Sequence, residues 1–369
     1  MDFTLTEEQR ELRSIVRKFL GARSSEPEVR RLMATEKGYD PDVWRQMSDQ
    51  LGLPGLAIPE EYGGAGFSYV ELGLVFEEMG RALLCAPYFS TVLAAEVLLR
   101  SGDEDAKKDL LPGIAAGETI ATLALLERAA GWGADGIAVA ATLGPGGWTL
   151  TGQKKHVLDG HVADLVLVVA RTPAGVSVFA VDQGYVATPV DTMDQTRKQA
   201  ELTFERTPAR LIGEEGAGWA TVERALDAAA ILLGAEQVGG ASAALDMAVE
   251  YAKVRIQFGR PIGSFQAIKH LLADTSLSLE MAKGLVGAAA VALGSGAPDG
   301  PELAHAAKAF VAERGPELAQ HCFQVFGGIG YTWEHDQHFW LRRLAADAQQ
   351  FGSAPWQRRA LLDLVGVTR

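Results

Sequence analysis

One arginine in this chain stands where it could bind an anion. Arg255 comes at the last turn of a predicted helix, just before a Gly/Pro loop that begins near Gly259. The helix is predicted because apolar residues recur at helical spacing over positions 245–252. A planar guanidinium at such a rigid end, with amide donors from Gln257 and Gln266, suits an anionic diester such as a pyrophosphate. The same place also suits an arginine that only interacts with the helix dipole.

The stretch from Tyr251 to Gln266 reads Tyr-Ala-Lys-Val-Arg-Ile-Gln-Phe-Gly-Arg-Pro-Ile-Gly-Ser-Phe-Gln and resembles the signature of the acyl-CoA dehydrogenase family. The segment 324–331, Gln-Val-Phe-Gly-Gly-Ile-Gly-Tyr, resembles a second family motif. The resemblance covers essentially the whole chain. It implies that these two motifs hold the adenine and pyrophosphate of an FAD bound mainly by a neighbouring subunit, with the paired glycines letting backbone approach the dinucleotide. The predicted cofactor-binding residues are Arg255, Gln257, Phe258, Gln266, Gln324, Gly327 and Gly328.

Two segments that contact the flavin ring in the family are altered here. In the first, Leu126 replaces a hydroxyl residue, Arg128 a proline and Trp132 a serine. In the second, His156 replaces an aromatic wall and Leu158 a threonine. Each lost hydroxyl removes a hydrogen bond worth about 0.5–1.5 kcal/mol. The sequence therefore predicts that this chain's own flavin-ring pocket is degraded.

The family's reaction, α,β-dehydrogenation of an acyl-CoA thioester, needs a carboxylate that takes the α-proton while a hydride leaves for the flavin. The resemblance places the two alternative positions of that glutamate at Phe351 and Ala229, and neither side chain accepts a proton. Glu236, Asp227 and Asp159 are the acidic residues nearby in sequence. No catalytic residue is predicted, and no metal ligand either, because no His/Cys/Asp cluster has metal-binding spacing.

Composition limits the partners. The 369 residues, 48% hydrophobic and 22% charged, indicate a globular protein of two or three domains, without a run of 18 or more apolar residues. A net charge of −13 without a basic cluster argues against nucleic acid or an anionic membrane as partner. Cys85 and Cys322 are expected to be packed rather than bridged, and the N-terminus lacks signal-peptide features, so a cytoplasmic location is predicted.

The patterning predicts an α+β protein that is mostly α. Residues 1–118 read as an N-terminal helical domain, with a capping box at Thr6–Gln9 and a helix cap at Asp40. Residues 119–213 read as a middle β domain with strands near 148–151, 165–169, 176–181 and 200–204. Residues 214–369 read as a C-terminal helical domain resembling a four-helix bundle.

The residues that the resemblance assigns to a neighbouring subunit's FAD are present in this chain. Those that it assigns to the chain's own flavin ring and catalytic base are replaced. This contrast favours a non-catalytic subunit of a heterotetrameric acyl-CoA dehydrogenase, whose paralogous partner supplies the glutamate, the ring pocket and the acyl cavity. Such heterotetramers are known among actinobacterial sterol side-chain dehydrogenases, so the acyl-CoA substrate is expected to be bulky, with an electron-transfer flavoprotein as electron acceptor. The alternatives are a self-sufficient homotetramer with another base, and a scaffold protein without flavin.

Overall fold

The computed structural model describes residues 5–127 and 131–367. The chain forms two compact units, one made of Met1–Arg30, Tyr69–Leu84 and Ala229–Arg369, the other of Arg31–Ser68 and Cys85–Ala228. The predicted sequence of helical, β and helical parts is confirmed. The boundaries after residues 118 and 213 remain predictions.

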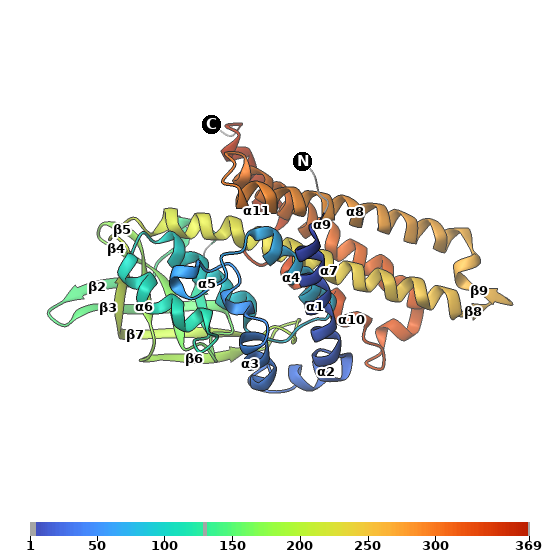
Figure 1. The fold of residues 1–369 in the computed structure, drawn as a ribbon, viewed down its shortest axis with the longest axis horizontal. Coiled ribbons are helices and arrows are strands. Elements are labelled where there is room, and N and C mark those ends of the chain that lie inside the picture. The colour runs from blue at the N-terminus through green and yellow to red at the C-terminus, as the bar shows by residue number, and fades with distance from the viewer. Residues whose placement is uncertain (1–4, 128–130, 368–369) are drawn as a thin grey trace. The chain divides into compact units, whose positions relative to one another are not determined.

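The first unit is helical. Its helix α9 packs against α8, α10 and α11, and α1 packs against α4 (Figure 1). Helices α4 and α7 cross closely, because a Cβ at Gly80 or Gly239 would collide with the backbone carbonyl of the other helix. The helices are α1 (Glu7–Arg23), α4 (Tyr69–Arg81), α7 (Gly218–Val254), which starts in the second unit, α8 (Gln266–Gly294), α9 (Gly300–Phe326), α10 (Gln337–Asp347) and α11 (Ala354–Leu364).

Two predicted helix starts are confirmed. Thr6 and Gln9 form a reciprocal capping box at α1, with the Gln9 amide donating to the Thr6 hydroxyl (3.2 Å) and the Thr6 amide to Gln9 Oε1 (3.0 Å). The Asp40 side chain accepts from the amides that open α3 (Pro41–Asp49). The short helix α2 (Glu26–Met33) was not predicted from the sequence.

The second unit is built on a sheet ordered β1-β4-β2-β3-β7-β5, with β6 paired to β7 and β4 paired to β5. Most pairs are antiparallel, and β4 pairs in parallel with β1 and β2, so the sheet is mixed. The strands are β1 (Ala121–Ala124), β2 (Ala140–Gly144), β3 (Gly147–Leu158), β4 (Leu165–Thr172), β5 (Gly175–Val181), β6 (Tyr185–Val190) and β7 (Gln199–Ile212). The unit also contains α3, α5 (Tyr88–Arg100) and α6 (Glu104–Ala115).

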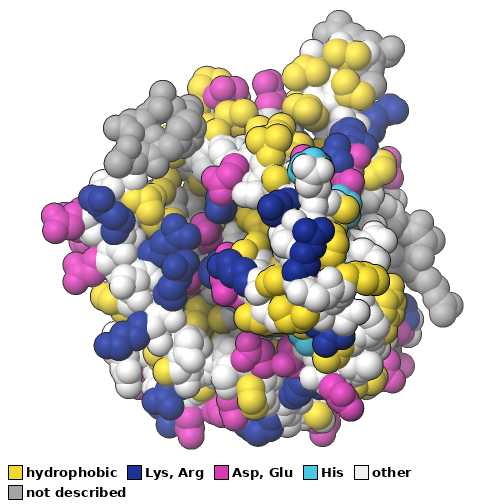
Figure 2. All heavy atoms as spheres, turned by 90° about the vertical axis from the view of Figure 1, so that its right-hand side faces the viewer, with side chains coloured by type: hydrophobic (Ala, Val, Ile, Leu, Met, Phe, Trp, Pro, Cys, Tyr) yellow, Lys and Arg dark blue, Asp and Glu magenta, His cyan; other side chains and the backbone are white. Residues whose placement is uncertain are grey.

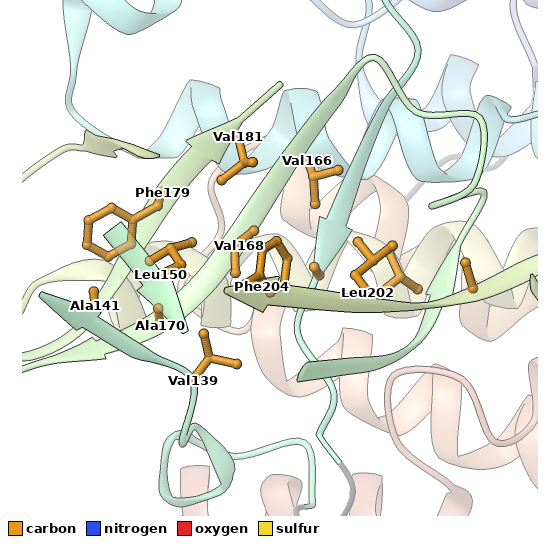
Figure 3. Close-up of a cluster of buried hydrophobic side chains, with 13 residues drawn as sticks. Val139, Ala141, Leu150, Val166, Val168, Ala170, Phe179, Val181, Leu202 and Phe204 are labelled. Carbon is orange, nitrogen blue, oxygen red and sulfur yellow. The ribbon is translucent and has the colours of Figure 1, made fainter. Parts of the chain in front are cut away.

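The core of this sheet is apolar. Phe179, Phe204 and Leu150 lie among buried valines and alanines of neighbouring strands (Figure 3). The four predicted strands fall within β3, β4, β5 and β7, while β1, β2 and β6 were missed. Cys85 and Cys322 are buried and unbridged, as predicted.

Helices α7 and α8 are long and apolar enough to cross a membrane on length and composition alone. The most apolar window of α7 is 100% buried within the protein, and that of α8 is 33% buried. Core helices of water-soluble proteins pass the same test, so this is a weak indication.

Candidate functional site

Arg255 stands at the base of a β-hairpin. Helix α7 ends at Val254, and the chain folds back as β8 (Ile256–Gln257) and β9 (Arg260–Pro261) where the sequence predicted only a loop. The two turn residues, Phe258 and Gly259, have φ values of +52° and +77°. Positive φ at both turn positions defines the type I′ turn that matches the twist of a hairpin. The Phe258 ring is therefore held at the tip, where the residue is 91% exposed.

The predicted binding residues lie on open surface. Arg255, Gln257, Phe258, Gln266, Gln324 and Gly328 are exposed and Gly327 is half-buried. Helix α8 begins at Gln266, and no side chain caps its first turn. Its amides thus remain available to an anion.

An aromatic contact joins the two predicted motifs. Tyr251, one turn before Arg255, packs on Phe326, the last residue of α9, with ring centroids 4.7 Å apart. Gly327 follows at once with φ +61°, and a Cβ on Gly327 or Gly328 would meet open space. The structure therefore brings the hairpin and the glycine turn together, and leaves room for a ligand to approach the glycine backbone.

The altered flavin segments are apolar where they were predicted to be. Leu158 is buried at 3% exposure, and Leu126 is half-buried, with its carbonyl accepting the Lys155 amide (2.8 Å). The exposed His156 bonds through Nδ1 to Gln199 Oε1 (2.8 Å). Arg128 lies outside the described residues.

A charged residue of one altered segment, Glu127, binds a charged residue of the other, Lys154. Lys154 is fully buried and donates to Glu127 Oε1 (2.5 Å) and to the Leu125 carbonyl (2.9 Å). The Glu127 carboxylate also accepts from the amides of Ala138 and Val139. This pair joins both ends of the loop that connects β1 to β2, so it holds the backbone of the segment.

Burial lowers the pKa of Lys154 to about 8, against the attraction of Glu127. In the unfolded chain Lys154 regains its ordinary pKa of 10.5, so between these two values the unfolded chain binds more protons than the folded one. The free energy of unfolding of the wild type, relative to Lys154→Met, should therefore rise with pH above about 8, by up to about 1.4 kcal/mol per pH unit. Urea unfolding from neutral to alkaline pH measures this. A difference that does not change with pH would contradict it.

The two positions for the base carry no carboxylate. Ala229 is 0% and Phe351 5% exposed, the latter with φ +53°. Glu236, the candidate substitute on α7, is buried and paired with Arg343 of α10 (Oε1–Nη1 2.5 Å). Asp159, another candidate, is buried and accepts from the Ser90 hydroxyl (2.7 Å). Within residues 5–127 and 131–367, no group of three or more His, Cys, Asp or Glu could hold a metal ion.

Family models match both ends of the chain. The model of the acyl-CoA dehydrogenase N-terminal domain matches residues 6–118, and that of the C-terminal domain matches residues 216–363. The chain belongs to the acyl-CoA dehydrogenase family. Members of this family are FAD-dependent oxidoreductases.

Known acyl-CoA dehydrogenases resemble the chain over nearly its full length. The acyl-CoA dehydrogenase IpdE2 of Mycobacterium tuberculosis is 36% identical, covering 94% of this chain and 93% of its own. The structure of the ChsE4-ChsE5 complex from Mycobacterium tuberculosis matches with a TM-score of 0.89 at 30% identity, covering 100% of both chains. A variant of the Tcur3481-Tcur3483 steroid acyl-CoA dehydrogenase gives a TM-score of 0.89 at 32% identity, with 99% of both chains covered.

The ADP half of FAD fits the exposed residues of the two motifs, whereas Leu126 and Leu158 place no hydroxyl where the family resemblance implies a bond to the flavin ring. An exposed guanidinium, an uncapped helix start and a glycine backbone open to solvent suit a dinucleotide diphosphate. Arg260 and Phe265 lie in the same region, and neither was among the predicted binding residues. Both lie within the recognised motif, but only the structure shows that Arg260 pairs across the hairpin with Gln257 and stacks on the Phe265 ring.

Proposed function

We propose that this chain is the non-catalytic subunit of a heteromeric acyl-CoA dehydrogenase. The observation that carries the proposal is an exposed Arg255 guanidinium beside the uncapped start of α8, in a chain that has Phe351 and Ala229 at the two positions of the base. The chain would contribute Arg255, the α8 amides and the Gly327–Gly328 backbone to an FAD that is completed by its partner. FAD, when bound, supplies the hydride acceptor. The partner subunit would supply the glutamate that takes the α-proton, and the acyl cavity.

The surface around these residues suits burial by another subunit. Large apolar side chains remain exposed on the hairpin, on α8 and after α9, and Figure 2 shows hydrophobic side chains intermingled with lysine, arginine and acidic ones. A monomer rarely leaves such an area uncovered. The exposed apolar residues are Val254 and Ile256 before the turn, Phe258 at its tip, Leu277 and Met281 on α8, and Ile329, Tyr331 and Trp333 after α9.

The names of the relatives narrow the proposed reaction. One similar structure is a steroid acyl-CoA dehydrogenase, and another is a complex of two named chains, ChsE4 and ChsE5. We take these as support for a paralogous partner and for α,β-dehydrogenation of a steroid-derived acyl-CoA. Electrons would pass to an electron-transfer flavoprotein, and the complex would work in the cytoplasm.

Flavin content tests the proposal. The protein purified alone should contain little FAD. Co-expression with an acyl-CoA dehydrogenase chain encoded beside it should yield a complex of both chains with bound FAD and acyl-CoA-dependent dye reduction. A flavin-loaded homotetramer that is active alone would favour the self-sufficient alternative. A flavin-free complex would favour the scaffold.

Restoring a glutamate should not restore activity. Phe351→Glu or Ala229→Glu supplies a carboxylate, but Leu126 and Leu158 still offer no hydrogen bond to a flavin ring. Burial at these positions also favours the neutral acid, which is a poor base. We expect no acyl-CoA-dependent dye reduction by either variant without a partner. The control is thermal unfolding of each variant, which should remain cooperative. Turnover by either folded variant alone would refute the degraded ring pocket.

A further inference from the structure

The hairpin carries a second arginine, Arg260, on the same face as Arg255. The hairpin register pairs Gln257 with Arg260, and the Ile262 amide donates to the Arg255 carbonyl (2.8 Å), which extends the pairing by one rung. Successive residues of a strand point to opposite faces, so Arg255 and Gln257 share a face. Arg260, directly across from Gln257, lies on that face too. The two arginines are then diagonal neighbours, about 7–8 Å apart at the backbone, which two long side chains easily span.

The Arg260 side chain is held in place by an aromatic ring. Its Cζ lies 4.1 Å from the ring centroid of Phe265, the residue just before α8. The same ring makes an edge contact with Phe258, with centroids 6.1 Å apart. A guanidinium stacked by its face keeps the N–H donors around its edge available. Because the planar group is already oriented, less conformational entropy is lost when it binds a ligand.

Neither arginine has a carboxylate partner among the described residues. Within the part of the chain that the structure describes, no ion pair joins a carboxylate to Arg255 or to Arg260. By contrast, the nearby Lys253 is paired with Glu250 (2.6 Å). A chain of net charge −13 thus keeps two uncompensated cations side by side on one short hairpin. A ligand with two adjacent anionic groups would meet one guanidinium for each group.

We propose that Arg260 is a second diphosphate-binding residue, so that the β8–β9 hairpin grips the FAD diphosphate between two guanidiniums with Phe265 as a platform for one of them. This inference rests on the proposed function. In this proposal the hairpin turn, in which Phe258 has a positive φ, sets the distance between the Arg255 and Arg260 guanidiniums.

The experiment measures FAD dissociation constants of the assembled heteromeric complex carrying Arg260→Gln, Arg260→Lys, Phe265→Leu or Arg255→Ala. Lys253→Gln is the matched control, because it also removes one exposed positive charge beside the hairpin. We expect Arg260→Gln to weaken FAD binding about three- to tenfold, with smaller losses for Arg260→Lys and Phe265→Leu. ADP, used as a competitor, should lose affinity by the same factor as FAD. High salt should shrink the difference between wild type and Arg260→Gln, and Lys253→Gln should bind FAD normally.

The outcomes separate this inference from the proposed function. Weaker binding in Arg255→Ala with unchanged binding in Arg260→Gln overturns the role of Arg260 and leaves the function standing. Unchanged binding in both variants overturns the proposed function itself. A loss of FAD affinity without a loss of ADP affinity places Arg260 away from the diphosphate. Failure of Arg260→Gln to assemble with the partner, while Arg260→Lys assembles, reassigns the residue to the subunit interface.

Discussion

Glu236→Gln should lower the free energy of unfolding by about 3–5 kcal/mol, because it leaves the buried Arg343 guanidinium without this counter-charge. Both residues are 2% exposed, and Glu236 Oε1 lies 2.5 Å from Arg343 Nη1, between α7 and α10. At this buried position, water cannot solvate the guanidinium in place of the lost carboxylate. Chemical denaturation of the purified chain measures the loss.

The matched control is the exposed pair of Glu280 and Lys283 on α8, which has a similar separation of 2.7 Å. There Glu280→Gln should cost no more than about 0.2–1 kcal/mol, since water and salt screen the pair. The double variant Glu236→Leu/Arg343→Met should recover much of the lost stability, as apolar replacements of buried ion pairs often do.

The same measurement bears on catalysis. A carboxylate held ready as a base is a strained, destabilising feature, so its removal tends to leave a fold unchanged or more stable while activity disappears. Suppose that Glu236→Gln were as stable as the wild type, and that the same change abolished dye reduction by a homotetramer of this chain. Glu236 would then be the missing base, and the self-sufficient homotetramer would be the favoured alternative. Because Glu236 is paired with Arg343, we expect instead that Glu236→Gln destabilises the fold.

Motifs that are contiguous in sequence could be read before the structure was known, whereas contacts between distant residues could not. Capping by Thr6 and Asp40 depends on residues two or three positions away, so both helix starts were predicted correctly. The contact between Tyr251 and Phe326 joins two helices far apart in the sequence. So does the ion pair of Glu236 and Arg343. Periodicity within one segment carries no signal for such pairs.

The strands that were missed have physical reasons. The four residues of β1 are all buried, and a short apolar run does not distinguish a strand from a helix. β6 contains Pro189, which weakens a strand pattern and suits its place at the edge of the sheet, paired only to β7. The hairpin of β8 and β9 was read as a loop because its turn is Phe258-Gly259, and the usual signal for a type I′ turn is Asn-Gly.

The sequence predicted which residues belong to the candidate site, but not how those residues are arranged in space. The family resemblance identified Arg255, Gln324 and the paired glycines, and the structure leaves them at open surface. Their role toward FAD stays a prediction. The pairing of Lys154 with Glu127 was not foreseen, although both lie in segments that were read closely. The bond between them depends on how β3 packs beside the end of β1, and neither segment alone carries a signal for that packing.

Arg255→Ala should weaken FAD binding to the assembled complex by about one to two orders of magnitude, equivalent to about 1.5–3 kcal/mol of charge-assisted hydrogen bonding. The guanidinium is exposed, the hairpin fixes its backbone, and the aromatic contact of Tyr251 with Phe326 holds the glycine turn beside it. Arg255→Lys should recover only part of the loss, because an ammonium group lacks the planar fork that meets two phosphate oxygens at once. Equilibrium titration with FAD, with assembly checked by sedimentation, gives both constants. The result that would reject the shared-cofactor proposal is wild-type FAD affinity in an Arg255→Ala complex that still assembles. The flavin would then be bound without this chain's arginine, and the exposed hairpin would serve subunit contact alone.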